Sequence, residues 1–272
     1  MFFENKWGYR LLIICEPIGG LNDRLKFLVS CMRIDENIKL IWPYKTHEVW
    51  LQCSFEDLFI NNFEVFNNRE ECYSKYDGVK YYSGSQFMKV DRDDITVNGF
   101  SMNNWGNSVP KKQKSSILKQ INNLKPSRYI QDIVDKFKSK FDDNVVTVSI
   151  RSFLDAKRNI GSNGKYFDIE TIFSSMDNEL YNEKTFYVTC DHQETFEKIF
   201  DRYKDRILYT PKRTYFGDYK TVEGTQDCVI DLILGGQPKH ILSTNGSGFC
   251  EMQWWFGGGN STIEIMRAHS NL

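Results

Sequence analysis

Apolar runs and amphipathic segments alternate regularly through the second half of the chain. The run VVTVSI at 145–150 is almost entirely apolar, which is typical of a central parallel strand buried on both faces. Further strands are expected at 185–190, 206–210, 240–244 and 261–266. Helices are expected between these runs, at about 168–180, 193–203 and 225–236, and after the NGSG turn at 245–248. This alternation predicts an α/β fold with a doubly wound parallel sheet.

The first half starts with the same pattern and then becomes less regular. A short buried strand is expected at 9–15, followed by an amphipathic helix and by a second strand in KLIWP at 39–43. Residues 73–112 are rich in Tyr, Asp, Asn and Gly, so we expect irregular structure there. Short strands are expected within that region near 78–82 and 95–100.

A polar, basic stretch separates the two halves. It is followed by Pro126 and by an amphipathic pattern that predicts a helix over 128–141, so we place the domain boundary within 108–128. The chain then divides into an N-terminal Rossmann-like domain at 1–125 and a C-terminal one at 126–272. Two such domains that face each other across a cleft account for the length of 272 residues.

Composition narrows the function classes. The net charge is −1, so no basic surplus indicates nucleic-acid binding. No apolar run approaches the roughly 18 residues of a membrane span, and the N-terminus lacks a signal-peptide pattern, so we expect a cytoplasmic protein without an integral membrane segment. None of the seven cysteines lies within four residues of another, and the four histidines form no H-x-x-x-H pair, so we expect reduced thiols and no metal centre.

Polar residues follow the predicted strands, where open α/β sheets bind their ligands. They are Gly19, Gly20, Asn22, Asp23 and Arg24, then Arg151, Asp191, and the turn Asn245, Gly246, Ser247. Glycines let the backbone approach a ligand, an arginine forks onto two phosphate oxygens, and a helix N-terminus offers free N–H groups. This mixture suits a nucleotide phosphate, although neither G-x-G-x-x-G nor G-x-x-x-x-G-K-[ST] is present.

Each of these positions also has a purely structural interpretation. Gly19 and Gly20 form a plain turn if Asn22 or Asp23 only caps the next helix, and Ser247 and Asp191 can act as caps in the same way. Arg151 can belong to an ion pair, for example with Asp155.

Two acidic positions need separate consideration. Asp231 lies in a mostly apolar helical segment, and a buried carboxylate there needs donors, which either a guanine edge or an arginine elsewhere in the chain would supply. The DRD sequence at 91–93 resembles the metal-binding Asp-x-Asp of one glycosyltransferase architecture, but its polar surroundings favour a solvated loop.

Four segments together resemble the GT-B fucosyltransferase superfamily, which holds α1,2-, α1,6- and protein O-fucosyltransferases. The segments are GGLNDRL at 19–25, VTVSIRSF at 146–153, FYVTCD at 186–191 and DLILGGQPKHILSTNGSGF at 231–249. The resemblance covers about 9–30 and 145–257 and leaves 70–125 unmatched. Its order and spacing imply a GT-B fold with two Rossmann-like domains.

The resemblance implies transfer of fucose from a GDP-fucose donor to a glycan or glycoprotein acceptor, with inversion and without a metal or other cofactor. By position, Arg151 would bind the β-phosphate and Asp231 the guanine edge, and Ser247 would assist at the phosphates. The loop from Gly19 to Arg24 would face the donor from the acceptor-side domain. Ser149 stands where the family motif has histidine, and Ser152 where many members have a second arginine.

The base that deprotonates the acceptor stays open between Asp23, which we favour, and three other carboxylates: Glu16, Asp155 and Asp191. A cytosolic microbial or viral enzyme of surface-polysaccharide biosynthesis or glycoprotein modification fits this assignment. The alternatives are a GT-B transferase that uses another nucleotide sugar, and a non-catalytic nucleotide- or carbohydrate-binding module on the same fold.

Overall fold

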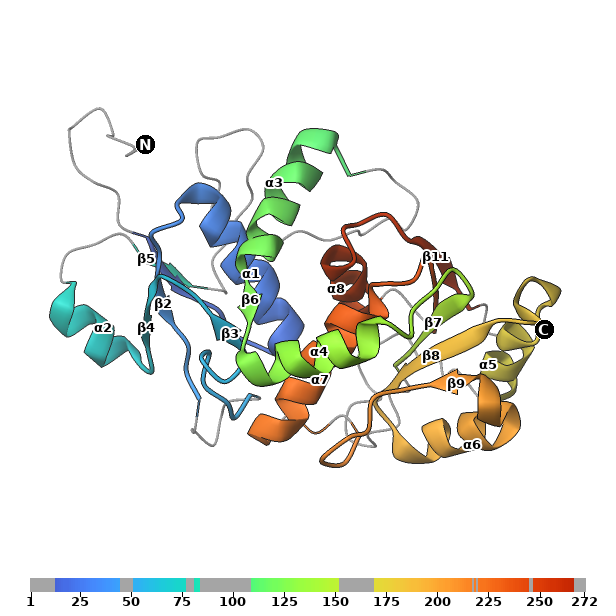
Figure 1. Cartoon of the computed structure of the whole chain (residues 1–272). Coiled ribbons are helices and arrows are strands. Elements are labelled where there is room, and N and C mark those ends of the chain that lie inside the picture. Colours follow the sequence, from blue (N-terminus) through green and yellow to red (C-terminus); the bar gives the residue numbers. More distant parts are fainter. Residues whose placement is uncertain are drawn as a thin grey trace, which may run out of the picture. The chain divides into compact units, whose positions relative to one another are not determined.

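The structure is a computed structural model that describes residues 13–44, 51–76, 81–83 (backbone only), 109–151, 169–216, 218, 220–244 and 247–266 (Figure 1). The described residues form two compact units. Of the described residues, those up to 127 and 220–225 belong to unit 1, and those of 128–218 and 226–266 belong to unit 2. The chain therefore returns to unit 1 at residues 220–225, within its C-terminal half. The sequence pattern did not indicate this return.

Unit 1 contains a parallel sheet of four strands in the order β4-β2-β1-β5. Its strands are β1 (Ile14–Glu16), β2 (Lys39–Ile41), β4 (Glu64–Phe66) and β5 (Tyr81–Ser83). Its helices are α1 (Leu21–Ile34), α2 (Arg69–Lys75) and α3 (Lys111–Asn123). A separate antiparallel ladder joins β3 (Phe59–Ile60) to β6 (Lys125–Pro126).

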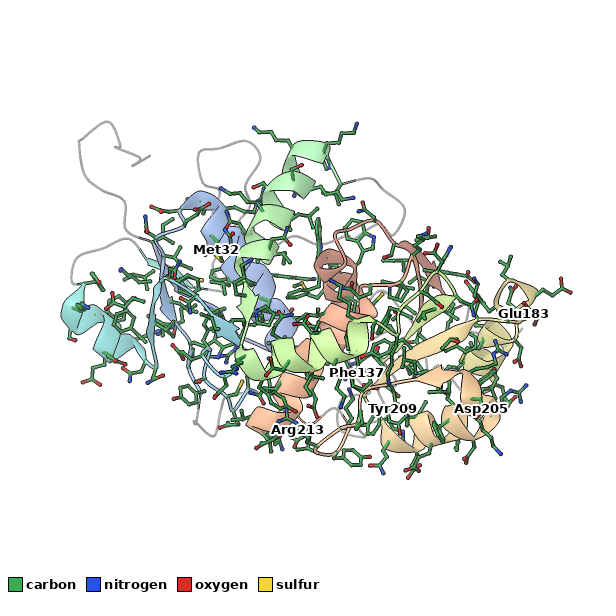
Figure 2. The ribbon with its side chains drawn as sticks, in the orientation of Figure 1. Met32, Phe137, Glu183, Asp205, Tyr209 and Arg213 are labelled. Atoms are coloured by element: carbon green, nitrogen blue, oxygen red, sulfur yellow. The ribbon has the colours of Figure 1, made fainter. Side chains whose placement is uncertain are left out.

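Helix α1 and aromatic rings fill the core of unit 1. Leu25 and Leu28 of α1 are fully buried, and Met32, labelled in Figure 2, is 5 % exposed. The indole Nε1 of Trp42 donates to the Cys53 carbonyl at 3.1 Å, and the Trp42 ring meets Phe55 edge to face with 5.2 Å between centroids. Trp42, which directly follows β2, is thereby anchored in the core of unit 1.

Unit 2 contains a parallel sheet of five strands in the order β11-β10-β7-β8-β9. Its strands are β7 (Val145–Ile150), β8 (Thr185–Cys190), β9 (Ile207–Leu208), β10 (His240–Ser243) and β11 (Thr262–Ile265). Its helices are α4 (Arg128–Lys138), α5 (Ile169–Met176), α6 (Gln193–Tyr203), α7 (Val222–Gly235, whose first four residues belong to unit 1) and α8 (Gly248–Phe256). Short 3₁₀ turns lie at Glu179–Tyr181 and Lys204–Arg206. The predicted α/β class with parallel sheets is confirmed.

The central strand β7 is buried at all six positions, as its apolar run predicted. The chain leaves β7 toward β8 and β9 and then returns to its other side as β10 and β11. The strand order reverses between β7 and β10, and in such sheets this switch point opens the crevice where ligands bind. In unit 1 the order reverses in the same way at β1, between β2 and β5.

Several element boundaries differ from the sequence-based expectations. The first strand was expected at 9–15 but is observed at Ile14–Glu16, with residues 9–12 outside the described part. The helix expected to reach 141 ends at Lys138. Helix α3 occupies part of the region that was expected to be a polar linker. Only two of its apolar residues, Ile117 and Ile121, are buried, so the apolar pattern was too sparse to predict a helix there. The strand expected at 95–100 lies outside the described residues.

Within the described part of the chain, no helix combines the length and hydropathy needed to cross a bilayer. The expected cytoplasmic location and the roles assigned to domains 1–125 and 126–272 stay predictions.

A glycine pair lets α7 and α8 approach each other closely. A Cβ on Gly236 would lie 2.2 Å from the Gln253 carbonyl oxygen and 2.6 Å from the Gly257 nitrogen, both backbone atoms. A Cβ on Gly235 would lie 2.2 Å from Nε2 of the Gln253 side chain. Backbone atoms cannot move aside as the end of a side chain can, so the helix crossing depends above all on Gly236.

We expect Gly236→Ala to destabilise unit 2 by about 1–3 kcal/mol, because the backbone of α8 must move away from the new methyl group. The midpoint of thermal unfolding measures this loss. Gly20→Ala is the matched control, because its φ is −74° and an added Cβ meets nothing within 4 Å. Equal midpoints for the two variants would contradict the close crossing.

Buried thiols predict a loss of stability at alkaline pH. Burial raises the pKa of Cys72 to about 11 and that of Cys53, Cys228 and Cys250 to about 12 each. Above pH 9 the unfolded chain releases these protons while the folded chain keeps them, so the free energy of unfolding falls as pH rises toward 11–12.

Each unit of pKa shift corresponds to about 1.4 kcal/mol, so the four thiols together amount to several kcal/mol. Urea unfolding at intervals from pH 7 to 10.5 checks this expectation. A Cys53→Ala variant, compared with its own value at pH 7, should show a shallower decline. A free energy of unfolding that stays level through pH 10.5 would contradict it.

Candidate active site

Arg151 and Asp191 lie side by side at the carboxyl edge of the sheet in unit 2. Arg151 directly follows β7 and Asp191 directly follows β8, and the parallel register pairs Ile150 with Cys190. The guanidinium Nη1 lies 2.5 Å from the Asp191 Oδ2, with the two side chains 25 % and 12 % exposed. Arg151 therefore has an ion-pair partner, but it is Asp191; Asp155, the example considered above, lies outside the described residues.

The end of β10 holds Arg151 from the other side. The Arg151 backbone N–H donates to Thr244 Oγ1 at 2.9 Å, and the Thr244 N–H donates to the Ser149 carbonyl at 3.1 Å. These bonds tie β7 to β10 at the switch point. Thr244 is fully buried and Ser149 is 3 % exposed, so the serine that replaces the motif histidine belongs to the packed end of the strand.

Ser247 caps helix α8. Its hydroxyl oxygen accepts the Cys250 N–H at 3.2 Å, and its own backbone is extended, as in other N-cap residues. The structural role that the sequence left open is therefore present. A cap of this kind also stands beside the free N–H groups of the helix terminus, where an anion is stabilised. Asn245 and Gly246 lie outside the described residues.

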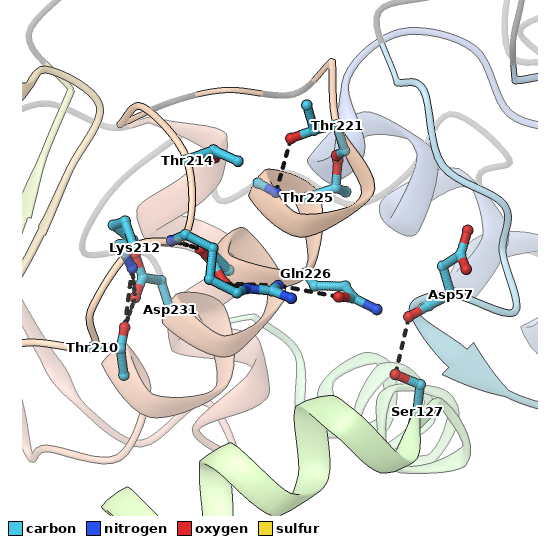
Figure 3. Close-up of polar contacts among 12 residues, drawn as sticks. Asp57, Ser127, Thr210, Lys212, Thr214, Thr221, Thr225, Gln226 and Asp231 are labelled. Carbon is cyan, nitrogen blue, oxygen red and sulfur yellow. Dashed lines mark hydrogen bonds and ion pairs between the residues drawn. The ribbon is translucent and has the colours of Figure 1, made fainter.

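Asp231 on α7 is 5 % exposed and has donors from within unit 2 (Figure 3). Its Oδ1 accepts from the Tyr187 hydroxyl at 2.9 Å and from Thr210 Oγ1 at 2.9 Å, and Lys212 Nζ lies 2.6 Å away. Burial, together with the Asp231 charge, raises the pKa of Tyr187 well above its ordinary value, so the phenol stays a donor. The donor requirement predicted for Asp231 is met by a lysine and two hydroxyls.

Asp227, one turn before Asp231 on α7, forms a second ion pair. Its carboxylate accepts from the Arg213 backbone N–H at 2.9 Å and from Arg213 Nε at 3.0 Å. The guanidinium also donates to Gln226 at 3.1 Å and lies 4.3 Å from the Tyr129 ring centroid. These residues were not predicted from the sequence, although two adjacent basic residues after a strand and two aspartates four apart on a helix were a usable signal.

The loop after β1 in unit 1 depends on Gly19 and on Arg24. Gly19 has φ +91°, a conformation that favours glycine, and a Cβ there would lie 3.3 Å from the Asp23 Oδ2. Arg24 is 2 % exposed and donates through Nε to the Gly19 carbonyl at 3.0 Å and through Nη1 to the Pro43 carbonyl at 2.9 Å. Burial lowers the pKa of Arg24 to about 10.

Arg24 thus connects the end of β1 to the end of β2, with its guanidinium 4.9 Å from the Trp42 ring centroid. A direct ligand contact by Arg24 has no support in this geometry, because the guanidinium is enclosed by its own loop. The arrangement favours a positioning role for the loop that carries Gly19, Gly20 and Asn22.

The remaining acidic candidates in unit 1 differ in exposure. Asp23 is exposed in the first turn of α1. Glu16, at the end of β1, is 5 % exposed and accepts from Arg69 Nε through both oxygens at 2.9 Å.

Asn22 Oδ1 is a buried acceptor that no donor reaches among the described residues. An unpaired buried amide oxygen is costly, so this position is suited to a ligand donor.

A shallow groove of about 320 Å³ on unit 2 is lined by Phe196, Glu197, Phe200, Asp201 and Tyr209 (the last labelled in Figure 2). None of the predicted site residues lines it. Across the described part of the chain, no group of three or more His, Cys, Asp or Glu side chains is placed to hold a metal. The metal-free reaction remains a prediction.

We expect Arg24→Met to lower the stability of unit 1 by about 2–4 kcal/mol, since it leaves the Gly19 and Pro43 carbonyls without their donor. Thermal unfolding measures the loss. Asp23→Asn is the control in the same turn of α1, because that side chain is exposed. An unchanged unfolding midpoint for Arg24→Met would show that the loop does not depend on this guanidinium.

Comparison with known proteins gives a likeness of structure alone. No protein-family model and no curated protein matches the sequence. Among solved structures, the NodZ α1,6-fucosyltransferase soaked with GDP-fucose matches 91 % of this chain and 93 % of its own, with a TM-score of 0.57 and 12 % identity.

Two further structures match over nearly their full length. The fucosyltransferase NodZ from Bradyrhizobium matches with a TM-score of 0.54 and 14 % identity, over 90 % of this chain and 92 % of its own. POFUT1 in complex with GDP-fucose matches with a TM-score of 0.53 and 12 % identity, over 94 % of this chain and 97 % of its own. The chain therefore has the fold of these fucosyltransferases, as the four sequence motifs predicted.

Proposed function

We propose that the protein transfers fucose from GDP-fucose to a hydroxyl group of a glycan or glycoprotein. The observation that carries the proposal is the place of Arg151, at the end of the central strand and at the switch point of a fold shared with fucosyltransferases. Two of the similar structures were determined with GDP-fucose, which supports this donor.

Arg151 acts on the leaving group in this proposal. As the bond between fucose and GDP breaks, negative charge develops on the β-phosphate, and a fixed guanidinium stabilises that charge where it forms. Asp191 and Thr244 hold Arg151 in place from the two neighbouring strands, so little reorganisation is needed during the reaction. The N-terminus of α8 at Ser247 adds a partial positive charge.

Asp231 reads the base in this proposal. Guanine presents N1–H and the 2-amino group side by side, and Oδ2 of Asp231 is the carboxylate oxygen left to accept from this edge, because Oδ1 already accepts from Tyr187 and Thr210 and contacts Lys212. Uracil and adenine lack this pair of donors, which favours GDP over UDP and ADP. The carboxylate of Asp231 is fixed and nearly buried, as a specificity residue requires.

Unit 1 supplies the acceptor side if the two units face each other in the GT-B manner. Asp23 is then the favoured general base, since it is exposed and follows the Gly19 turn directly. Glu16 and Asp191 are weaker candidates because each accepts from an arginine. A base opposite the departing GDP produces a single displacement with inversion, and the positive groups named above need no metal or other cofactor.

Incubation with GDP-fucose and EDTA tests the proposal by measuring GDP release with and without glycan acceptors. Arg151→Ala should lower turnover by about 10²–10³-fold, because it removes the charge that stabilises the leaving group. Arg202→Ala is the control: this arginine on α6 is 48 % exposed, pairs with Asp177, and should leave turnover unchanged.

Other nucleotides extend the same test. GDP should raise the unfolding midpoint more than UDP or ADP does, because a ligand that binds only the folded state stabilises it. If the protein turns over a UDP- or ADP-sugar and not GDP-fucose, that sugar nucleotide is the donor and the proposed GDP-fucose is wrong. Binding of GDP without release from GDP-fucose under any acceptor would instead indicate a non-catalytic module.

A further inference from the structure

The segment that follows β9 is joined to α7 by two consecutive basic side chains. Lys212 pairs with Asp231, and Arg213 pairs with Asp227 at 2.9 Å. Both carboxylate side chains are only 7 % exposed. Lys212 is 10 % exposed, so its pair with Asp231 is buried, whereas Arg213 is 31 % exposed and reaches its buried carboxylate from a partly exposed position. The two aspartates are four residues apart and therefore lie on one face of the helix.

The contacts of Asp231 are concentrated on one of its two oxygens. Tyr187, Thr210 and Lys212 all approach Oδ1 within 2.9 Å. Lys212 Nζ also donates to Thr210 Oγ1 at 3.0 Å, so lysine, threonine and aspartate form a closed ring. Among the residues that the structure describes, no donor reaches Oδ2 of Asp231.

The backbone around Asp231 is fixed as well. Gln253 of α8 is fully buried and donates through Nε2 to the Asp231 carbonyl at 3.3 Å and to Thr189 Oγ1 at 3.1 Å. Both the carboxylate and its main chain are therefore held by residues of other elements. Such a one-sided arrangement fixes the plane of the carboxylate and the direction in which Oδ2 points.

We propose that Lys212 is a positioning residue for base recognition, which holds the Asp231 carboxylate so that Oδ2 accepts the 2-amino group of guanine. The inference rests on the proposed function, because it gives Asp231 a guanine to read. Lys212 does not touch the ligand; it acts through Asp231, together with Thr210 and Tyr187.

The charge of Lys212 is required as well as its hydrogen bonds. The surroundings of Asp231 include the second carboxylate Asp227, the thiol of Cys228 and the phenol of Tyr187, and Lys212 is the cation in contact with Asp231 among the described residues. A buried carboxylate without a cation is unfavourable in its charged form. Removal of Lys212 therefore weakens Asp231 as an acceptor for an N–H donor.

Titration calorimetry of the full chain with GDP and with inosine diphosphate tests the inference. Inosine diphosphate keeps the phosphates, the ribose and N1–H and lacks only the 2-amino group. The wild type should bind GDP about tenfold or more tightly than inosine diphosphate, since a hydrogen bond to a charged group is lost. In Lys212→Met the preference should fall to within about threefold, because Met keeps the packing of the side-chain stem without its charge.

Arg213→Met is the matched control. It breaks the neighbouring ion pair on the same helix face, so it should lower the unfolding midpoint and leave the preference for GDP at the wild-type ratio. Thr210→Val keeps the side-chain shape and removes one donor to Oδ1, so it should reduce the preference by a smaller factor. Thr210→Val decides the question if Lys212→Met does not fold.

The outcomes separate the inference from the proposed function. A Lys212→Met protein that retains the wild-type preference overturns the inference alone. Equal affinity of the wild type for GDP and inosine diphosphate also overturns it, while GDP release from GDP-fucose would still support the transferase. A wild type that binds neither nucleotide removes the proposed function and the inference together.

Discussion

The ion pair between Arg151 and Asp191 depends on the register of two parallel strands. Because β7 and β8 pair Ile150 with Cys190, the next residue of each strand emerges at the same edge of the sheet. A guanidinium and a carboxylate are thereby placed in contact without a long loop to position either of them. β10 closes the arrangement from the other side through Thr244, and the site is built on rigid elements.

The same topological reasoning applies to both units. In each sheet the first strand of the unit has neighbours on both sides, and the strand order reverses there. Polar residues lie at the end of that strand in both cases: Glu16 is the last residue of β1 and precedes the Gly19 turn, and Arg151 directly follows β7. A reversal of strand order leaves the carboxyl ends of neighbouring strands uncovered, because the connections leave in opposite directions. The candidate site residues of each unit therefore lie at the strand ends where its strand order reverses.

Buried charge is organised differently in the two units. In unit 1, Arg24 holds backbone carbonyls and shapes a loop. In unit 2, Lys212 and Arg213 hold the carboxylates of one helix face. Arg24, Lys212 and the two carboxylates are almost fully enclosed, so each must be satisfied by its neighbours. A residue whose type is common at ligand sites can therefore have a structural role instead, as Arg24 does.

Local pattern determined the class of this protein. Apolar runs such as 145–150 and the amphipathic segments between them predicted parallel α/β sheets, because periodicity and burial depend on residues close in the sequence. The residue types at the strand ends predicted where a site would lie. Only the tertiary structure decided that Arg151 pairs with Asp191, that Lys212 supports Asp231, and that Arg24 turns inward. Those contacts join residues 40, 19 and 19 positions apart, and no local periodicity specifies distance or direction across such separations.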